Sequence, residues 1–243
     1  MTGLTLNELM KFDLDTYSRF IRHLQLHYRL GAVRDMLRED MPHVILRHDV
    51  DVSLPLALKM AKAEHDLGVK ATYFILLSSR HYNSLEGNNA STIRAIAELG
   101  HEIGLHYDTS AYRLYSNDCR EAIKLEVETL ERLSKQKITA LSCHAPKGPD
   151  SFIHIEGYYD TDDPLLRDVY VHDSQGVWSI RSLSTLLNKK PKKVLLNTHP
   201  LVWTGAPSHK SRLNILMLDS LLFLYRIRAI GMRLIHSQEA CPS

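Results

Sequence analysis

Short apolar runs rich in β-branched residues alternate with helical segments along most of this chain. Seven of these runs are expected to be strands, with helices between them. Strands that alternate with helices predict a parallel sheet, because a parallel neighbour needs a crossover connection. The expected strands are Val44–Leu46, Ala71–Leu77, Glu102–Asp108, Ile138–Ser142, Asp168–Val171, Lys193–Leu196 and Met232–Ile235.

The helical segments carry residues that begin and end helices. After the first expected strand, Ser53 is a predicted N-cap, Pro55 falls in the first turn and Gly68 follows the helix. No linker rich in Pro, Ser or Gly interrupts the chain, so we expect one domain over residues 1–243, with a mostly helical segment over residues 1–43 packed on it. Further helices are expected over Ser91–Leu99, Asn117–Ser134 and Leu213–Ile230.

Polar side chains of catalytic type stand at the carboxyl ends of these strands. In β/α barrels the active site is built there from several strands, whereas in an open sheet it gathers at one switch point. Functional residues at the ends of at least five strands therefore favour a barrel. The residues are His48, Asp49, Asp51, His106, Asp108, Cys143, His144, His172, Asp173, Thr198, His199 and His236.

Two of these strand ends have the spacing of a metal site. Side chains alternate along a strand, so Asp49 and Asp51 point the same way, as do His106 and Asp108. Carboxylates and an imidazole at a barrel mouth suit a divalent metal such as Zn²⁺, with one carboxylate left over as general base. Each residue taken alone also fits a turn, a cap or a structural hydrogen bond.

Composition and missing motifs exclude other classes of protein. A formal charge of +2 gives no basic footprint for nucleic acid, and the chain has no GxSxG, Walker or GxGxxG motif. Its most apolar stretch, Ile215–Tyr225, is far shorter than the roughly 20 residues that span a bilayer. Three widely spaced cysteines and an N-terminus without an apolar signal core predict a cytoplasmic protein with reduced thiols.

Five segments resemble the motifs of the polysaccharide deacetylases, the NodB-homology or family-4 carbohydrate esterases. Gly100–Gly104 (Gly-His-Glu-Ile-Gly) matches the second motif of that family letter for letter. Leu46–Asp51 is similar to the first motif, an Asp pair, with Val50 inserted between the two acids. Segments similar to the third, fourth and fifth motifs are Ser142–Gly148, Asp173–Trp178 and Leu195–His199, so the resemblance runs from about Val44 to His199.

The resemblance implies an α/β fold, a distorted, seven-stranded (β/α) barrel of the polysaccharide deacetylase type. It also implies an enzyme that uses a divalent metal, expected to be Zn²⁺. Asp49 corresponds to the general base and His199 to the general acid. The expected metal ligands are Asp51, His106 and His144, and the expected substrate-binding residues are Tyr107, Asp108, Asp173 and Trp178.

Two positions depart from the family pattern. Ser110 stands where the family has its second metal-binding His, and His144 stands where it has an Arg. His144 could complete the metal shell, orient Asp49 in place of the Arg, or be structural, and Asp108 is another candidate for the missing ligand. Stacking of Trp178 on a sugar ring and core packing are equally compatible with the sequence.

The function that the resemblance implies is removal of an acetyl group from a sugar or nucleotide-sugar intermediate of bacterial surface polysaccharide (O-antigen) biosynthesis. An N-acetyl group is the preferred prediction and an O-acetyl group the second. Arg47, Arg181 and Lys147 could contact an anionic substrate, or be solvated charges or ion pairs. The alternatives are a metal-dependent amidohydrolase or phosphoesterase on a similar barrel, and a non-catalytic sugar-binding relative without its metal. The presence of both Asp49 and His199 argues against the last of these.

Overall fold

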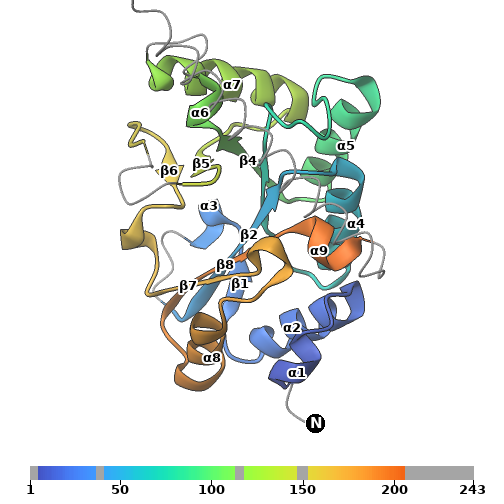
Figure 1. Ribbon diagram of the computed structural model, residues 1–243, viewed down its shortest axis with the longest axis vertical. Coiled ribbons are helices and arrows are strands. Elements are labelled where there is room, and N and C mark those ends of the chain that lie inside the picture. The colour runs from blue at the N-terminus through green and yellow to red at the C-terminus, as the bar shows by residue number, and fades with distance from the viewer. Residues whose placement is uncertain (1–4, 37–40, 113–117, 147–152, 206–243) are drawn as a thin grey trace, which may run out of the picture. The chain divides into compact units, whose positions relative to one another are not determined.

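The computed structural model describes residues 5–36, 41–112, 118–146 and 153–205. Its strands form one parallel sheet in the order β6–β5–β4–β3–β2–β8–β7, and β1 pairs with β2 outside that path (Figure 1). The strands are β1 (Arg29–Gly31), β2 (His43–Val50), β3 (Thr72–Ile75), β4 (Glu102–Tyr107), β5 (Ala140–Cys143), β6 (Tyr159–Asp160), β7 (Val169–His172) and β8 (Lys193–Thr198).

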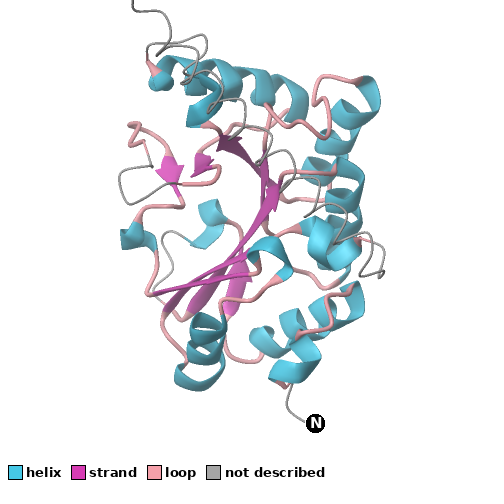
Figure 2. Ribbon diagram, in the orientation of Figure 1, coloured by secondary structure: helices cyan, strands magenta, loops and turns pink. Residues whose placement is uncertain are grey.

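The sheet curls, with helices packed along it (Figure 2). Among the described strands, β6 and β7 end the path and do not pair with each other, so the sheet is a partial barrel. The predicted parallel β/α barrel is confirmed in this open form. The helices are α1 (Leu6–Leu9), α2 (Leu14–Gln25), α3 (Val33–Met36), α4 (Leu54–Asp66), α5 (Gly87–Glu98), α6 (Thr109–Tyr112), α7 (Cys119–Ser134), α8 (Ile180–Lys189) and α9 (Pro200–Thr204).

Six of the seven predicted strands are confirmed as β2, β3, β4, β5, β7 and β8. The short strands β1 and β6 were not predicted, and β1 interrupts the N-terminal segment that we expected to be mostly helical. The predicted helix Leu213–Ile230, the predicted strand Met232–Ile235 and the C-terminal part of the expected single domain lie outside the described residues. No helix in the described ranges is long and apolar enough to cross a membrane.

Helix α4 begins and ends where its sequence predicts. Ser53 accepts a hydrogen bond from the Leu56 N–H, Pro55 lies in the first turn, and Gly68 follows with a φ of +71°. Helix α5 begins at Gly87, earlier than expected, because the Glu86 carboxylate accepts hydrogen bonds from two N–H groups of its first turn. These ends fix the lengths of the loops that carry the site.

Strand β2 lies at the centre of the sheet and is buried along all eight of its residues. It pairs with β1 and β3 on one edge and with β8 on the other. Val44, Leu46 and Val50 belong to the large core that includes the buried faces of α2, α4, α5 and α7. Ile45 belongs to a second, smaller cluster of mainly strand residues inside the curl. The two faces of β2 therefore meet different surroundings.

A buried polar network lies on the helix-facing side of β2. Glu64 of α4 is 0% exposed, and its carboxylate accepts hydrogen bonds from the hydroxyls of Tyr17 (2.5 Å) and Tyr73 (2.6 Å) and from His48 Nε2 (2.8 Å). His48 Nδ1 lies 2.8 Å from the Thr198 hydroxyl. Burial opposes the charge of Glu64, but His48 and these hydrogen bonds outweigh it and lower the pKa of Glu64. The network ties α2, α4, β2, β3 and β8 together.

Candidate metal and catalytic site

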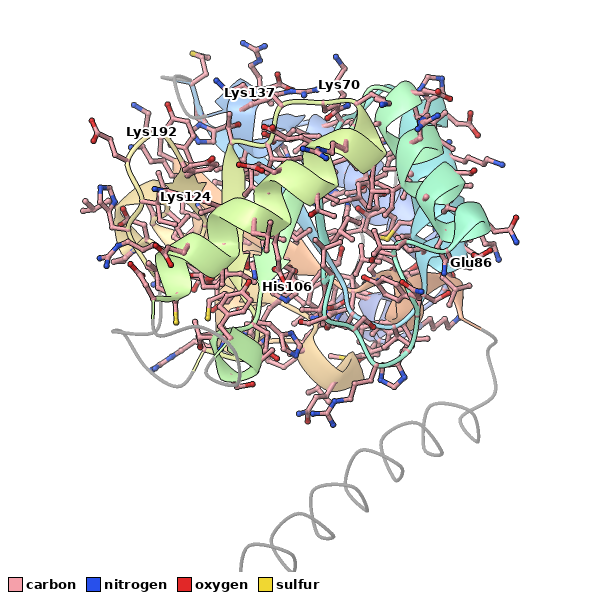
Figure 3. All side chains as sticks on the ribbon, turned by 90° about the horizontal axis from the view of Figure 1, so that it is seen from above. Lys70, Glu86, His106, Lys124, Lys137 and Lys192 are labelled. Atoms are coloured by element: carbon pink, nitrogen blue, oxygen red, sulfur yellow. The ribbon has the colours of Figure 1, made fainter. Side chains whose placement is uncertain are left out.

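Three side chains from three strand ends converge on one point inside the curl. They are Asp51 after β2, His106 of β4 and His144 after β5. Asp51 Oδ1 lies 3.4 Å from His106 Nε2 and 3.5 Å from His144 Nδ1, and these two nitrogens are 3.2 Å apart. In the part of the chain that the structure describes, this is the one cluster with the arrangement of a metal site. His106, labelled in Figure 3, is buried.

The three donor atoms fit a divalent ion in spacing, and His106 also fits it in protonation. A tetrahedral ion with bonds of about 2.0–2.1 Å separates its ligand atoms by about 3.3 Å. His106 Nδ1 lies 3.1 Å from the Ser142 carbonyl oxygen, which can only accept, so Nδ1 carries the proton and Nε2 presents a lone pair. Asp51 Oδ1 is buried without a hydrogen-bond partner, which costs about 1–3 kcal/mol unless a cation satisfies it.

The charges of Asp51 and His106 also suit a cation. Burial lowers the pKa of His106, so its ring stays neutral, as a metal ligand must be. Burial opposes the charge of Asp51, but the imidazoles of His144 and His106 outweigh it and lower the pKa of Asp51. Burial likewise opposes the charge of His144, and the nearby Asp51 carboxylate raises its pKa. The carboxylate is therefore ionised and faces two imidazole nitrogens.

Asp49, the predicted general base, is held by a buried arginine. Arg47 donates from Nε to Asp49 Oδ1 at 2.8 Å and from Nη2 to Oδ2 at 3.0 Å, a bidentate pair. Asn197 of β8 donates from Nδ2 to the same Oδ2 at 2.8 Å. Burial opposes the charge of Asp49, but Arg47 outweighs it and holds the pKa of Asp49 well below its ordinary range. Asp49 is therefore ionised and fixed in orientation.

Asn197 was not predicted as a site residue, and Arg47 was predicted only as a possible contact of an anionic substrate, a solvated charge or an ion pair. Of the alternatives for Arg47, the structure shows the ion pair: its guanidinium also contacts the Thr161 hydroxyl at 2.8 Å and Asp162 at 3.3 Å. Arg47 stands two residues before Asp49 on β2, and Asn197 stands near the end of β8 two residues before His199, and this spacing was the available signal. Of the other two candidate cations, Arg181 is exposed on α8 and Lys147 lies outside the described residues.

His199, the predicted general acid, is held by Asp173. Asp173 is 0% exposed and accepts hydrogen bonds from His199 Nδ1 (2.6 Å), from the His199 backbone N–H and from Trp203 Nε1 (2.6 Å). Burial opposes the charge of His199, but the hydrogen bond to Asp173 outweighs it and raises the pKa of His199 to about 9. The predicted substrate-binding residue Asp173 thus contacts His199, and the imidazole is protonated at neutral pH.

The base, the acid and the candidate ligands share one small volume. His199 Nε2 lies 4.0 Å from Asp49 Oδ2 and 3.8 Å from Asp51 Oδ2. His106 Nε2 lies 3.8 Å from Asp49 Oδ2. The structure therefore brings together five of the strand-end residues, those to which the family resemblance assigned the roles of base, acid and metal ligand: Asp49, Asp51, His106, His144 and His199.

The side chains of Tyr107 and Asp108 are both engaged in hydrogen bonds with other residues of the protein. Tyr107 is buried, donates its hydroxyl to Asp160 at 2.6 Å, and its carbonyl accepts the His144 backbone N–H at 2.8 Å. Asp108 accepts hydrogen bonds from the N–H and hydroxyl of Ser110, at 2.8 and 2.6 Å. Neither Asp108 nor Ser110 belongs to the metal-like cluster, so His144 is the better candidate for a third ligand.

Trp178 lies in the core. Its side chain is 3% exposed, its Nε1 donates to the Leu9 carbonyl at 3.0 Å, and its ring packs on Phe12, Phe20 and Trp203. Stacking on a sugar requires an exposed ring face. The core-packing alternative for Trp178 is therefore the one that the structure supports.

Removing a candidate ligand should abolish tight metal binding. Loss of a residue that hydrogen-bonds to a metal ligand lowers metal affinity by about 10- to 100-fold. We expect His106→Ala and Asp51→Ala each to lower Zn²⁺ affinity by more than this, because each removes a direct donor. Calorimetric titration of chelator-treated protein measures this, with the exposed histidine variant His27→Ala as a control that should bind like the wild type. Unchanged affinity in His144→Ala would remove His144 from the ligand set.

Comparisons with known proteins give matches only among solved structures, since no family model and no curated protein matches this chain. One match is a mutant of a CE4 family pseudoenzyme with restored enzymatic activity, a protein of Bacillus anthracis (14% identity, 78% of this chain and 64% of that chain covered, TM-score 0.46). The chain thus spans less than two thirds of the length of that structure.

Two further matches have the names of deacetylases. One is a peptidoglycan deacetylase from Bacillus subtilis (16% identity, 82% of this chain and 98% of that chain, TM-score 0.45). The other is the chitin deacetylase of the fungal pathogen Colletotrichum lindemuthianum (19% identity, 73% of this chain and 81% of that chain, TM-score 0.43).

Proposed function

We propose that this protein is a metal-dependent hydrolase that removes an acetyl group from the nitrogen of an acetylated sugar. The observation that carries the proposal is the meeting of an ionised carboxylate, Asp49, and a protonated imidazole, His199, whose nearest atoms lie 4.0 Å apart beside the Asp51–His106–His144 cluster. Amide hydrolysis needs a proton acceptor, a proton donor and an electrophile in this proximity. The sugar and the acetyl group follow from the motif resemblance of residues 44–199.

Asp49 is the proton acceptor in this proposal. As a water oxygen attacks the amide carbonyl carbon, one of its protons passes to the Asp49 carboxylate. Arg47 and Asn197 fix that carboxylate from two sides, so its Oδ2 faces the histidines without reorganisation. The low pKa of Asp49 keeps it ionised and ready to accept, at the cost of weak intrinsic basicity.

A divalent metal held by Asp51, His106 and His144 would offset that weak basicity, because it polarises the carbonyl and lowers the pKa of water. His199 is the proton donor: Asp173 fixes Nδ1, which leaves Nε2–H directed toward Asp49 and Asp51. When the carbon–nitrogen bond breaks, the nitrogen takes the Nε2 proton and leaves as the amine. Acetic acid is the other product, and the proton that Asp49 holds restores His199 between turnovers.

The proposal is tested by acetate release from chelator-treated protein before and after Zn²⁺ is added. Substrates are N-acetylglucosamine oligomers, the nucleotide sugar UDP-N-acetylglucosamine and an O-acetylated sugar ester. We expect acetate only with metal, and from an N-acetyl sugar faster than from the ester. A protein that binds Zn²⁺ but releases only ammonia or phosphate from an amide or phosphate-ester panel would be the alternative hydrolase. A protein that binds sugar but no metal would be the non-catalytic relative.

Asp173 is a positioning residue in this scheme, and its loss should reduce turnover without loss of metal. Asp173→Asn removes the charge that keeps His199 protonated, so we expect kcat to fall by about 10²-fold, the scale of one acid–base group. Zn²⁺ affinity should stay within a few-fold of wild type, since Asp173 contacts no candidate ligand in the described residues. Steady-state kinetics and calorimetry measure the two, with the exposed Asp168→Asn as matched control. Wild-type kcat in Asp173→Asn would contradict the role of His199.

A further inference from the structure

The turn that carries Asp51 is held from a neighbouring loop. This loop, residues 76–86 between β3 and α5, contributes two hydroxyls: Tyr82 donates to the Val50 carbonyl at 2.5 Å and Ser79 donates to the Asp51 carbonyl at 2.7 Å. Val50 is the last residue of β2, and Asp51 follows it directly. The loop therefore contacts the main chain on the residue that bears a candidate ligand and on the residue before it.

The two hydroxyls bond to carbonyls at the point where the strand pairing of β2 ends. The β2–β8 pairing stops at His48 and the β2–β3 pairing stops at Val50. Carbonyls in a protein interior need a hydrogen-bond donor, and Val50, the last paired residue, and Asp51 after it lie where the pairing ends. The hydroxyls of Tyr82 and Ser79 fill that need at the two successive positions.

The loop is itself braced so that these hydroxyls keep their places. The Tyr82 oxygen accepts the Leu76 N–H at 3.2 Å, and the Ser79 oxygen accepts the His81 N–H at 3.1 Å. The Ser79 N–H is in turn bonded to the Leu76 carbonyl at 3.1 Å. Each hydroxyl thus accepts from its own loop and donates to the turn. At the far end of the loop, Glu86 (labelled in Figure 3) caps α5.

We propose that loop 76–86 is a latch that sets the metal affinity of the Asp51 site, a proposal that rests on metal binding in the proposed function. To bind metal, the Asp51 carboxylate must keep Oδ1 beside two imidazoles, where it is buried without a hydrogen-bond partner, and a turn with a free main chain would allow other positions of that oxygen. Holding the main chain of Asp51 removes that escape before metal arrives. Because coupling between two events is reciprocal, metal binding at Asp51 also orders the latch.

Metal titration of hydroxyl variants tests the latch. We expect Ser79→Ala and Tyr82→Phe each to weaken Zn²⁺ binding by roughly 10-fold, the lower end of outer-partner losses, and the double variant to lose more. Ser79→Thr keeps the hydroxyl and should bind Zn²⁺ like the wild type. If the loss in Ser79→Ala came from altered packing instead, Ser79→Thr, which also changes the packing, would bind more weakly too. Tyr28→Phe is the control, since the Tyr28 hydroxyl is buried and has no hydrogen-bond partner among the described residues.

Hydrogen exchange provides a readout that does not depend on turnover. Amides of residues 76–86 should exchange more slowly when wild-type protein is saturated with Zn²⁺, and this protection should shrink in Ser79→Ala. If the wild type binds metal but the variants bind as tightly and the loop gains no protection, the latch is wrong and the proposed function stands. If the wild type binds no metal, the proposed function fails with it. Should Tyr82→Phe fail to fold, the Ser79→Ala and Ser79→Thr pair decides.

Discussion

Replacing Asp49 with asparagine should lower kcat by about 10²- to 10⁴-fold, the full contribution of a positioned general base. Asparagine keeps the size of the side chain but cannot take a proton from water. Zn²⁺ affinity should remain near the wild-type value, because Asp49 is outside the Asp51–His106–His144 cluster. Acetate release and calorimetry on the same preparation measure the two quantities.

The control for Asp49→Asn must account for Arg47, which loses its bidentate partner in that variant. Asp162→Asn is matched to it, because Asp162 contacts the same guanidinium at 3.3 Å and leaves the base in place. We expect Asp162→Asn to lower the melting temperature while turnover stays within a few-fold of wild type. An equal loss of kcat in both variants would mean that the Arg47 ion pair, and not proton acceptance by Asp49, limits the reaction.

Replacing Glu64 with alanine should destabilise the protein by about 3–5 kcal/mol, the usual cost of removing one partner from a buried ionic pair. The hydroxyls of Tyr17 and Tyr73 and the Nε2 of His48 would lose their acceptor in a site that water does not reach. Urea denaturation measures the free energy of unfolding. Glu98→Ala is the control, since Glu98 is exposed at the end of α5 and its loss should change stability by less than about 0.5 kcal/mol.

Activity separates this effect from the chemistry of the site. Glu64 contacts the helix-facing side of β2, whereas Asp49 contacts groups inside the curl. Well below its melting temperature, Glu64→Ala should therefore keep a kcat close to wild type. A stable Glu64→Ala protein with low kcat would show that the buried network acts on the site, for example through the link from His48 to Thr198, the residue before His199.

Most strand positions were predictable from the sequence because β2, β3, β4, β5 and β8 are continuous, largely buried apolar runs, although β7 is only partly buried. The two missed strands lack that signal: β1 has three residues and β6 has two, too few for any periodicity. Both are paired in the structure by neighbours distant in sequence, β1 with β2 and β6 with β5. Their existence depends on tertiary contacts that a local pattern does not contain.

Part of the candidate site was likewise predictable from the sequence, and part of it was not. The strand-end rule predicts that Asp49, Asp51, His106, His144 and His199 lie near one another, because the carboxyl ends of parallel strands meet at one edge. It does not predict which charges pair, since Asp173 contacts a residue 26 positions away. It also does not separate a ligand-facing tryptophan from a core one. The partners of Trp178 include Phe12 and Phe20 from the first fifty residues, and no local pattern around Trp178 indicates them.

Side chains along β2 and the residue after it alternate between the two faces of the sheet. Odd-numbered residues (Ile45, Arg47, Asp49 and then Asp51) meet the interior of the curl, and even-numbered residues (Val44, Leu46, His48, Val50) meet the helices. Deleting or inserting a single residue here would exchange the two sets, placing an aspartate against the helices and apolar side chains at the candidate metal site. In this chain, a change of length here would therefore disrupt both faces of β2 at once, whereas a substitution at an odd position would change the candidate metal site and leave the helix-facing packing in place.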